Sequence, residues 1–328
     1  MTEGSLRAPL SSPPEVPALP VHPARRWSGF WADAGRRLSR NRVAMWSLLF
    51  LGALIVIAGI GPLLLPYSYE KQNLLDLYAP PSRAHPLGTD HLGRDILTRL
   101  VYGARISLAV GFAAEAIILF LGTLIGAATG YLGGWIDTTA MRFVDALYAF
   151  PDLLLIIIVM SYVKAQFGGA VPAALVPLAG LNKATGGLLG VFIALGLTSW
   201  LTTCRLVRGQ ILSLKHRDYV EAARCLGAGP GRIVRAHLLP NTLGPILVAA
   251  TLGVPNAILL EASLSFIGLG VDPPMPSWGI MVSEGVAAVQ SYPHIIIAPV
   301  LAIGLTLLAF NTLGDGLRDA LDPLMRKV

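Results

Sequence analysis

Long apolar blocks alternate with polar stretches along the chain, and six blocks reach or approach the length of about 20 residues that a helix needs to cross a bilayer. The second and fifth blocks each contain one carboxylate, Glu115 and Glu261. The blocks cover residues 43–65, 108–131, 143–163, 187–206, 243–266 and 295–313. This pattern predicts an all-α integral membrane protein with six transmembrane helices. A shorter apolar stretch, 171–181, contains Pro172 and Pro177, and we expect an interfacial or re-entrant segment there.

The composition agrees with a membrane protein and excludes several other classes. Hydrophobic residues make up 54% of the chain and charged residues only 13%, whereas a typical soluble domain has about 25% charged residues. Two cysteines, Cys204 and Cys225, are too few for a disulfide scaffold. Residues 1–33 differ from the rest because they are rich in proline and arginine, and we expect a disordered cytoplasmic tail there.

The distribution of basic residues predicts the orientation in the membrane. With six spans, the side of the two termini holds 18 of the 25 lysines and arginines, and the opposite side holds seven. The positive-inside rule therefore places both termini and the basic loop 205–241 in the cytoplasm. The net charge of +6 is explained by this topology and by contact with the lipid bilayer, so we expect no nucleic acid partner.

The blocks divide the chain into four parts. The tail is followed by 34–65, a basic flank with the first span, and by 66–107, an extracytoplasmic amphipathic segment. The core of five helices, 108–328, contains a cytoplasmic loop at 207–241. In 66–107 the apolar spacing from Ile96 onwards predicts a helix along the outer face, which serves either as a structural lid or as a docking surface. Two histidines in this segment do not make a metal site, and we predict none.

The second block also carries glycines at intervals of four residues, Gly122, Gly126 and Gly130, continued by Gly134. Glycines at this spacing lie on one face of a helix and allow a second helix to approach closely. We expect them to pack against another span.

The loop 205–241 has the pattern of two short helices. Asp218 is expected to cap the first helix, with Glu221 completing a capping box, and Gly227 to end it in the left-handed conformation. Pro230 suits the first turn of a second helix, which we expect Pro240 to end. The first helix then has a narrow apolar stripe that fits a groove in another protein. The alternative is that the helix lies on the lipid headgroups or folds under the bundle. The stripe consists of Tyr219, Ala222, Ala223 and Leu226.

Four segments of the chain resemble permeases of ATP-binding-cassette (ABC) importers, specifically the C-type permeases of the dipeptide, oligopeptide and nickel branch. The loop matches their EAA motif, although His237 stands where the general pattern has isoleucine. The other segments are 85–95 with 103–108, 133–145 and 261–279, so the resemblance covers about residues 34–325. The resemblance assigns the ATPase-coupling positions to Asp218, Tyr219, Glu221, Ala222, Ala223, Gly227, Leu239 and Pro240.

The resemblance implies an ABC type I importer permease in a bacterial inner membrane. It implies a second, homologous permease, two ATPase subunits or one fused ATPase, and an extracytoplasmic substrate-binding protein as partners. This chain is then not an enzyme, since it contains no G-x-x-x-x-G-K-[ST] phosphate loop. It would bind no cofactor itself, because ATP and magnesium would belong to the ATPase subunits.

Glu115 and Glu261 are candidate residues of a translocation path, because a carboxylate at membrane depth is costly unless it faces water or a partner. Glu115 either faces the path, where it could meet a substrate amine, or has a structural role. The structural role would be a pair with Arg105 or another span, or a position shallow enough to reach the membrane interface. The expected substrates are di- or oligopeptides, with nickel chelates or glutathione-like molecules as the alternative. An ion-coupled secondary transporter is a less favoured alternative, because that class is characterised by broken helices and inverted repeats, and no repeat is evident.

Overall fold

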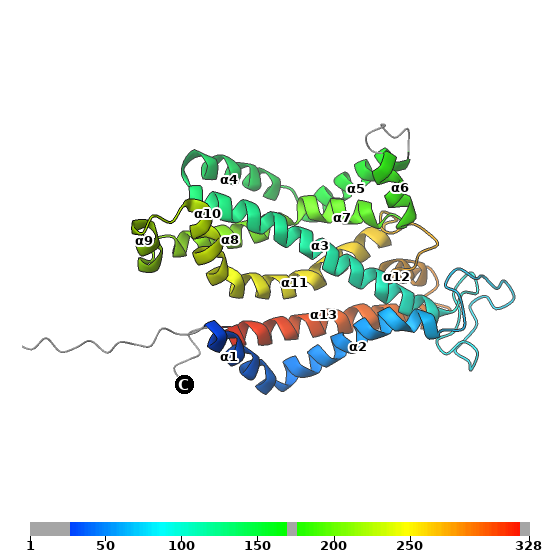
Figure 1. The fold of residues 1–328 in the computed structure, drawn as a ribbon. Helices are drawn as coiled ribbons and strands as arrows, with labels where there is room; N and C mark the ends of the chain where they lie inside the picture. The colour runs from blue at the N-terminus through cyan, green and yellow to red at the C-terminus, as the bar shows by residue number, and fades with distance from the viewer. Residues whose placement is uncertain (1–26, 169–175, 322–328) are drawn as a thin grey trace, which may run out of the picture.

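The computed structural model describes residues 27–168 and 176–321, and the described elements are all helices (Figure 1). Most helices run along the long axis of an elongated bundle. The elements are α1 (Trp27–Arg40), α2 (Arg42–Leu64), α3 (Ile96–Leu132), α4 (Gly134–Tyr148), α5 (Asp152–Gly168), α6 (Val176–Ala184), α7 (Leu188–Thr198), α8 (Trp200–Leu214), α9 (Asp218–Cys225), α10 (Pro230–Ile233), the π-helix η2 (Val234–Leu238), α11 (Leu239–Phe266), α12 (Trp278–Val286) and α13 (His294–Leu321).

Four of these helices, α2, α3, α11 and α13, are long and apolar enough to cross a membrane. They correspond to the first, second, fifth and sixth predicted spans, which are therefore confirmed. The expected separate helix before the second span is wrong. Its residues form the first turns of α3, because Asp95 caps that helix at its start and accepts hydrogen bonds from the backbone N–H and hydroxyl of Thr98, each at 2.7 Å.

The third and fourth predicted spans are interrupted. α4 and α5 meet at an angle of 92° around Pro151, and Ser199 separates α7 from α8. α6 and α7 are bent by 111°, and α6 covers most of the predicted re-entrant stretch, of which 171–175 lies outside the described residues. Length and composition allow four to six crossings, depending on whether each bent pair counts as one span.

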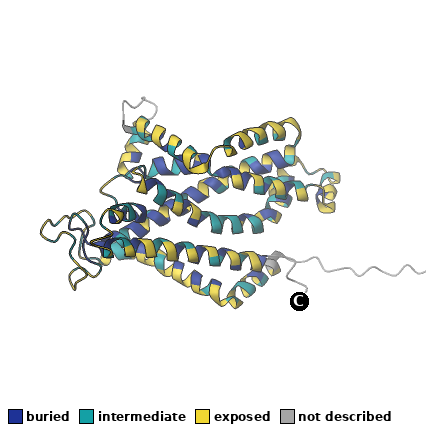
Figure 2. Cartoon of the chain, turned by 180° about the vertical axis from the view of Figure 1, so that it is seen from behind, coloured by how far each residue is buried: buried dark blue, intermediate teal, exposed yellow. Residues whose placement is uncertain are grey.

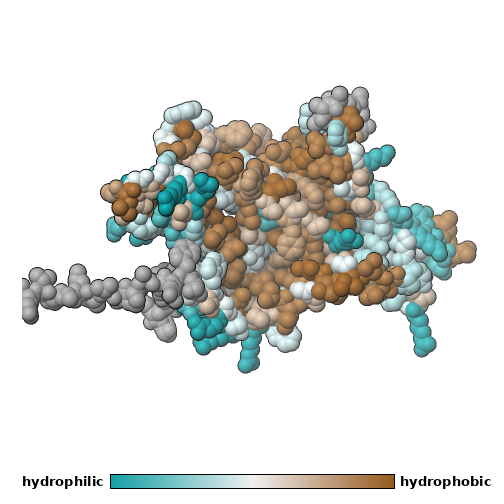
Figure 3. All heavy atoms as spheres, in the orientation of Figure 1, coloured by the Kyte–Doolittle hydropathy of each residue, from teal (hydrophilic) through white to brown (hydrophobic). Residues whose placement is uncertain are grey.

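The ends of the described chain lie close together. α1 packs against α13, and the start of α1, the end of α13 and α9 lie at one end of the bundle (Figure 1). The polar segment between α2 and α3 lies at the opposite end. Hydrophobic side chains cover the middle of the molecule and polar ones gather at the two ends (Figure 3). The long helices expose much of their outer surface (Figure 2), as in the case of Trp46 and Leu63 on α2, which is expected of helices that face lipid.

α3 packs along α8 through the predicted glycine face. A Cβ atom at Gly122 would lie 2.7 Å from Cβ of Thr203, and one at Gly126 would lie 2.5 Å from the carbonyl oxygen of Cys204. Gly130 makes the same kind of approach to α8. Gly134 does not belong to this face, because it begins α4 with a φ of +60° and has open space around it.

Replacing Gly126 with valine is therefore expected to push α3 and α8 apart. We expect the overpacking to lower the free energy of unfolding by about 1–3 kcal/mol, measured by thermal unfolding in detergent. The control is Gly52→Ala on α2, where no atom outside the neighbouring residues and backbone of its own helix lies within 4 Å of the added methyl group. Since alanine favours a helix over glycine, the control should be neutral or slightly stabilising. Equal losses in the two variants would contradict the close-packing explanation.

Candidate functional site

The predicted loop folds into a short helix that projects from one end of the bundle. α9 ends in a Schellman motif, in which the N–H of Ala228 bonds to the carbonyl of Ala223 at 3.0 Å and that of Gly227 to the carbonyl of Arg224 at 2.9 Å. Gly227 has a φ of +82°, as the sequence predicts. Because a residue with a Cβ rarely adopts this conformation, glycine is the natural residue at this turn.

The predicted start of α9 is wrong in detail. Arg217 occupies the N-cap position without a capping side chain, and Asp218 is the first helical residue. Glu221 does not form a capping box but pairs with Arg224 at 2.8 Å. Pro240 does not end the second helix either, because α10 continues through η2 into α11, where Pro240 lies in the first turn.

The inner face of α9 anchors it to the bundle. Val220 and Ala223 are buried, and Val220 packs in a cluster with Ile211 of α8 and with Ile233 and Leu238 of the following helices. The predicted stripe is therefore divided, because Ala223 faces inwards. Tyr219, Ala222 and Leu226 remain exposed, and Leu226 has 88% of its surface accessible.

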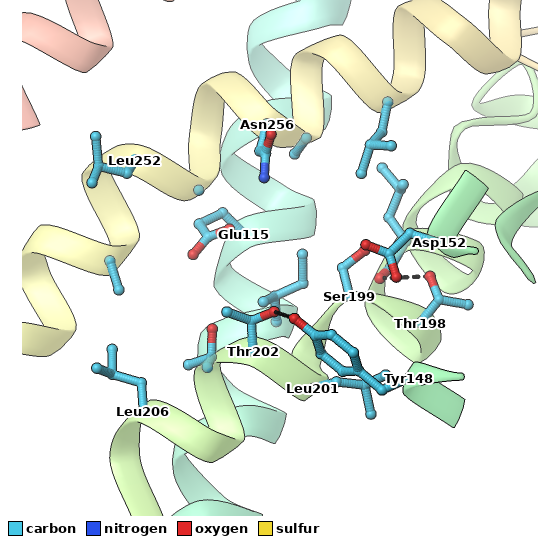
Figure 4. Close-up of a pocket in the computed structure, with 17 residues that line it drawn as sticks. Glu115, Tyr148, Asp152, Thr198, Ser199, Leu201, Thr202, Leu206, Leu252 and Asn256 are labelled. Atoms are coloured by element: carbon cyan, nitrogen blue, oxygen red, sulfur yellow. Dashed lines mark hydrogen bonds between the residues drawn. The ribbon is translucent and has the colours of Figure 1, made fainter. Parts of the chain in front are cut away.

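A cavity of about 270 Å³ lies deeper in the bundle, between α3, α8 and α11 and beside the two helix breaks. Glu115 comes from α3, Asp152 from the start of α5 and Asn256 from α11 (Figure 4). Thr198 and Ser199 line the cavity where α7 gives way to α8. Irregular backbone at membrane depth is tolerated where it lines a water-filled cavity. The break at Ser199 meets this condition, because Ser199 lines the cavity.

Glu115 is 5% exposed and points into this cavity (Figure 4). Among the described residues it has no hydrogen-bond or ion-pair partner, and the suggested pair with Arg105 does not form. A Cβ atom at Gly253 on α11 would overlap the Glu115 carboxylate. Glycine at this position therefore makes the space that the carboxylate occupies.

Glu261 lies elsewhere and does not line the cavity. It is fully buried and accepts hydrogen bonds from Ser265 at 2.6 Å and from Ser107 at 3.5 Å. Ser107 in turn accepts one from the backbone N–H of Trp278, so the group joins α3, α11 and α12. This arrangement indicates a structural role for Glu261 rather than contact with a substrate.

The sequence did not reveal a buried ion network at the end opposite α9. Arg99 of α3 pairs with Asp90 and with Glu284 of α12, each at 2.5 Å. Arg94 contacts the same two carboxylates at 2.7 and 3.0 Å. Burial disfavours the charged form of Asp90, but Arg99, Arg94 and two backbone hydrogen bonds outweigh it and hold the pKa of this carboxyl below its usual range. The network fixes the segment before α3 onto α12.

One group of side chains in this network has the spacing of a metal site. Ligand atoms of Asp90, His91 and Glu284 lie within 4.8 Å of one another. Both carboxylates are already engaged by Arg94 and Arg99, whose positive charges would repel a cation. We therefore assign no metal to this group.

Two arginines of α8 form ion pairs with aspartates of α4. Arg208 makes a bidentate pair with Asp137 at 2.5 and 2.7 Å, and Arg205 pairs with Asp145. The Arg205 guanidinium also lies 4.2 Å from the centre of the Tyr148 ring, and Tyr148 lines the cavity. These contacts fix α4 beside the cavity.

Comparison with known families gives two matches. Residues 119–327 match the family described as the binding-protein-dependent transport system inner membrane component. Residues 29–81 match the N-terminal TM domain of oligopeptide transport permease C.

Individual relatives agree with these matches. The chain is 44% identical to the dipeptide transport system permease protein DppC of Bacillus subtilis over 90% of this chain and 86% of that protein. It is 42% identical to the oligopeptide permease OppC of the same organism, with 90% of each chain covered. The glutathione transport system permease protein GsiD of Pectobacterium atrosepticum is 41% identical, with 92% of each covered.

A solved structure supports the fold. A chain from an inward-facing structure of the MetNI methionine ABC transporter superposes with a TM-score of 0.51 and 18% identity. The match covers 69% of this chain and 98% of the other. At this identity the likeness concerns the fold alone.

Proposed function

Because this chain belongs to the family of binding-protein-dependent inner membrane transport components, we propose that it is a permease subunit of an ATP-driven peptide importer and that α9 couples it to an ATPase subunit. It is a multi-pass protein of the inner membrane. A second permease and an extracytoplasmic binding protein would complete the importer. ATP and magnesium would bind to the ATPase subunits and not to this chain.

The observation that carries the coupling proposal is the division of α9 into two faces. One face is anchored through Val220 and Ala223, and the other presents Tyr219, Ala222 and Leu226. An exposed apolar stripe on a short helix is the surface with which a helix enters a groove of a partner protein. Anchoring on the inner face would let a movement of the partner act on α8 and α11 directly.

Peptides are the favoured substrate class because relatives at 42–44% identity are named dipeptide and oligopeptide permeases. Glutathione is the second candidate, since relatives at 41–42% identity are named for glutathione transport. The family name argues against an ion-coupled secondary transporter, although bent helices of the kind that class uses are present. Nickel chelates remain an expectation of the sequence resemblance without support from the relatives named here.

The native cysteines allow a direct test. Cys225, on α9, is exposed, whereas Cys204 is buried in α8, so a membrane-impermeant maleimide should label only Cys225. We expect labelling in inverted vesicles but not in intact spheroplasts, because the proposal places α9 in the cytoplasm. Co-expression with the ATPase subunits of the importer should slow the labelling at least tenfold.

Two results would contradict the proposal. Labelling from the outer side would place α9 away from any ATPase. Unchanged labelling in a purified complex that contains the ATPase subunits would show that they bind elsewhere on the chain. Uptake of a labelled peptide that requires both ATP and the binding protein would support the importer function independently.

A further inference from the structure

The Glu115 carboxylate is buried in the bundle without a counter-charge. It is 5% exposed, and among the described residues no side chain or backbone group donates a hydrogen bond to it. The other buried carboxylate at membrane depth, Glu261, has serine donors at 2.6 and 3.5 Å. An unpaired buried carboxylate is costly for a protein to keep, and a cation that enters the cavity would remove much of this cost.

The lining of the cavity favours a cation over an anion. Among the described residues that line it, only Glu115 and Asp152 are charged, and both are acidic. Arg205 does not line the cavity but lies over the ring of Tyr148, which does. Its positive charge is paired with Asp145. Asn256 offers a further oxygen, so the polar groups of the cavity suit a donor-rich ammonium group.

The size of the cavity suits one end of a substrate and not a whole one. The cavity measures about 270 Å³, close to the lower limit of the range of about 300–1,000 Å³ that is usual for small-molecule sites. It is open to the surface, because Asp152 and Asn256 in its lining are exposed. Gly253 keeps it open, because a Cβ atom there would overlap the Glu115 carboxylate. A primary ammonium group on a short stem fits this space, and a carboxylate would be repelled by both acids.

We propose that the cavity binds the protonated amino terminus of the transported peptide, with Glu115 as its counter-ion. This inference rests on the proposed importer function and names the substrate group that the path recognises. Every unblocked peptide has one amino terminus, while its side chains vary, so a single acidic site serves many sequences. Glutathione also carries a primary amine, and the same site would accept it.

The test uses the complete importer in proteoliposomes with its binding protein. Uptake is measured for a tripeptide and for its des-amino analogue, in which hydrogen replaces the amino group. Each rate is divided by the fraction of binding protein that is occupied, measured separately on the isolated binding protein, so that selection by that subunit is removed. We expect wild type to prefer the free amine by about tenfold, which corresponds to about 1.4 kcal/mol.

Glu115→Gln should reduce this preference to about one by slowing the free-amine peptide. Glu115→Asp, which keeps the charge, should retain it. Gly253→Ala keeps the glutamate but displaces its carboxylate, so this variant should also lose the preference. It is an independent route if Glu115→Gln folds poorly. The matched control is Glu70→Gln, the same chemical change at an exposed residue before α3, and it should leave the preference unchanged.

Thermal unfolding distinguishes recognition from a structural role. Since Glu115 has no partner to lose, Glu115→Gln should unfold at the same temperature as wild type or at a higher one. Three results would overturn the proposal. The first is a lower unfolding temperature of Glu115→Gln together with an equal loss of uptake of both peptides. The others are a tenfold preference that survives in Glu115→Gln and a wild-type preference near one. If wild type transports neither peptide, the importer function fails first.

Discussion

Replacing Ala222 with tryptophan is expected to reduce ATP-driven uptake at least tenfold while the chain still folds and inserts. Ala222 lies on the exposed face of α9, so the larger side chain has room within this chain. The partner groove that we propose for α9 would be shaped for a small residue at this position and would have no room for an indole ring. The measurement is peptide uptake in cells that produce the whole importer, together with recovery of the ATPase by pull-down.

The control for this variant is Thr139→Trp, which adds the same bulk at an exposed position of α4. We expect wild-type uptake from the control and an unfolding temperature close to wild type from both variants. If Ala222→Trp transports normally with the ATPase bound, α9 is not the coupling helix. If Ala222→Trp also unfolds early, its loss of uptake has a structural origin, and the smaller change Ala222→Leu then decides the question.

Replacing Arg99 with alanine is expected to cost about 3 kcal/mol in the free energy of unfolding. The change removes the cation that pairs with Asp90 and Glu284 and leaves buried negative charge behind. Breaking a buried ion pair in this way typically costs about 3–5 kcal/mol. We expect the lower end of this range for two reasons. The Glu284 side chain is 22% exposed and can be hydrated by water, and Arg94 still contacts both carboxylates.

Chemical denaturation of the detergent-solubilised chain measures this cost, with Arg105→Ala as the matched control. Arg105 lies on the same helix but is exposed, so its loss should change stability by no more than about 0.5 kcal/mol. A cost below about 1 kcal/mol for Arg99→Ala would mean that the network behaves like surface ion pairs. The segment before α3 would then be held mainly by its apolar contacts.

The sequence predicted those parts of the fold that depend on local pattern. α2, α11 and α13 begin or end within a few residues of the uninterrupted apolar runs, because length and hydropathy alone decide where a span can lie. The positive φ of Gly227 was also predictable, since the residue type favours it. The break at Ser199 was not predictable, because no proline lies near it and Gly196, the nearest glycine, lies within α7.

The candidate site was only partly predictable, since it depends on contacts between distant residues. Glu115 stood out as a charge in an apolar block, but its position depends on Gly253, on another helix. Asn256 and Asp152 were missed, although a polar residue within or beside an apolar block is the signal that could have identified them. The partner of Arg94 and Arg99 on α12 is nearly 200 residues away and left no local pattern.

α3 differs from the other three long helices in one feature of its sequence. It runs for 37 residues, about 55 Å at 1.5 Å per residue, without a proline, whereas α2, α11 and α13 each contain at least one. Since prolines are the usual points at which helices bend, we expect α3 to bend less than the other three long helices. If the cavity changes shape during transport, we expect α11 to bend between Pro245 and Pro255, the stretch that carries Gly253, while α3 keeps Glu115 in place.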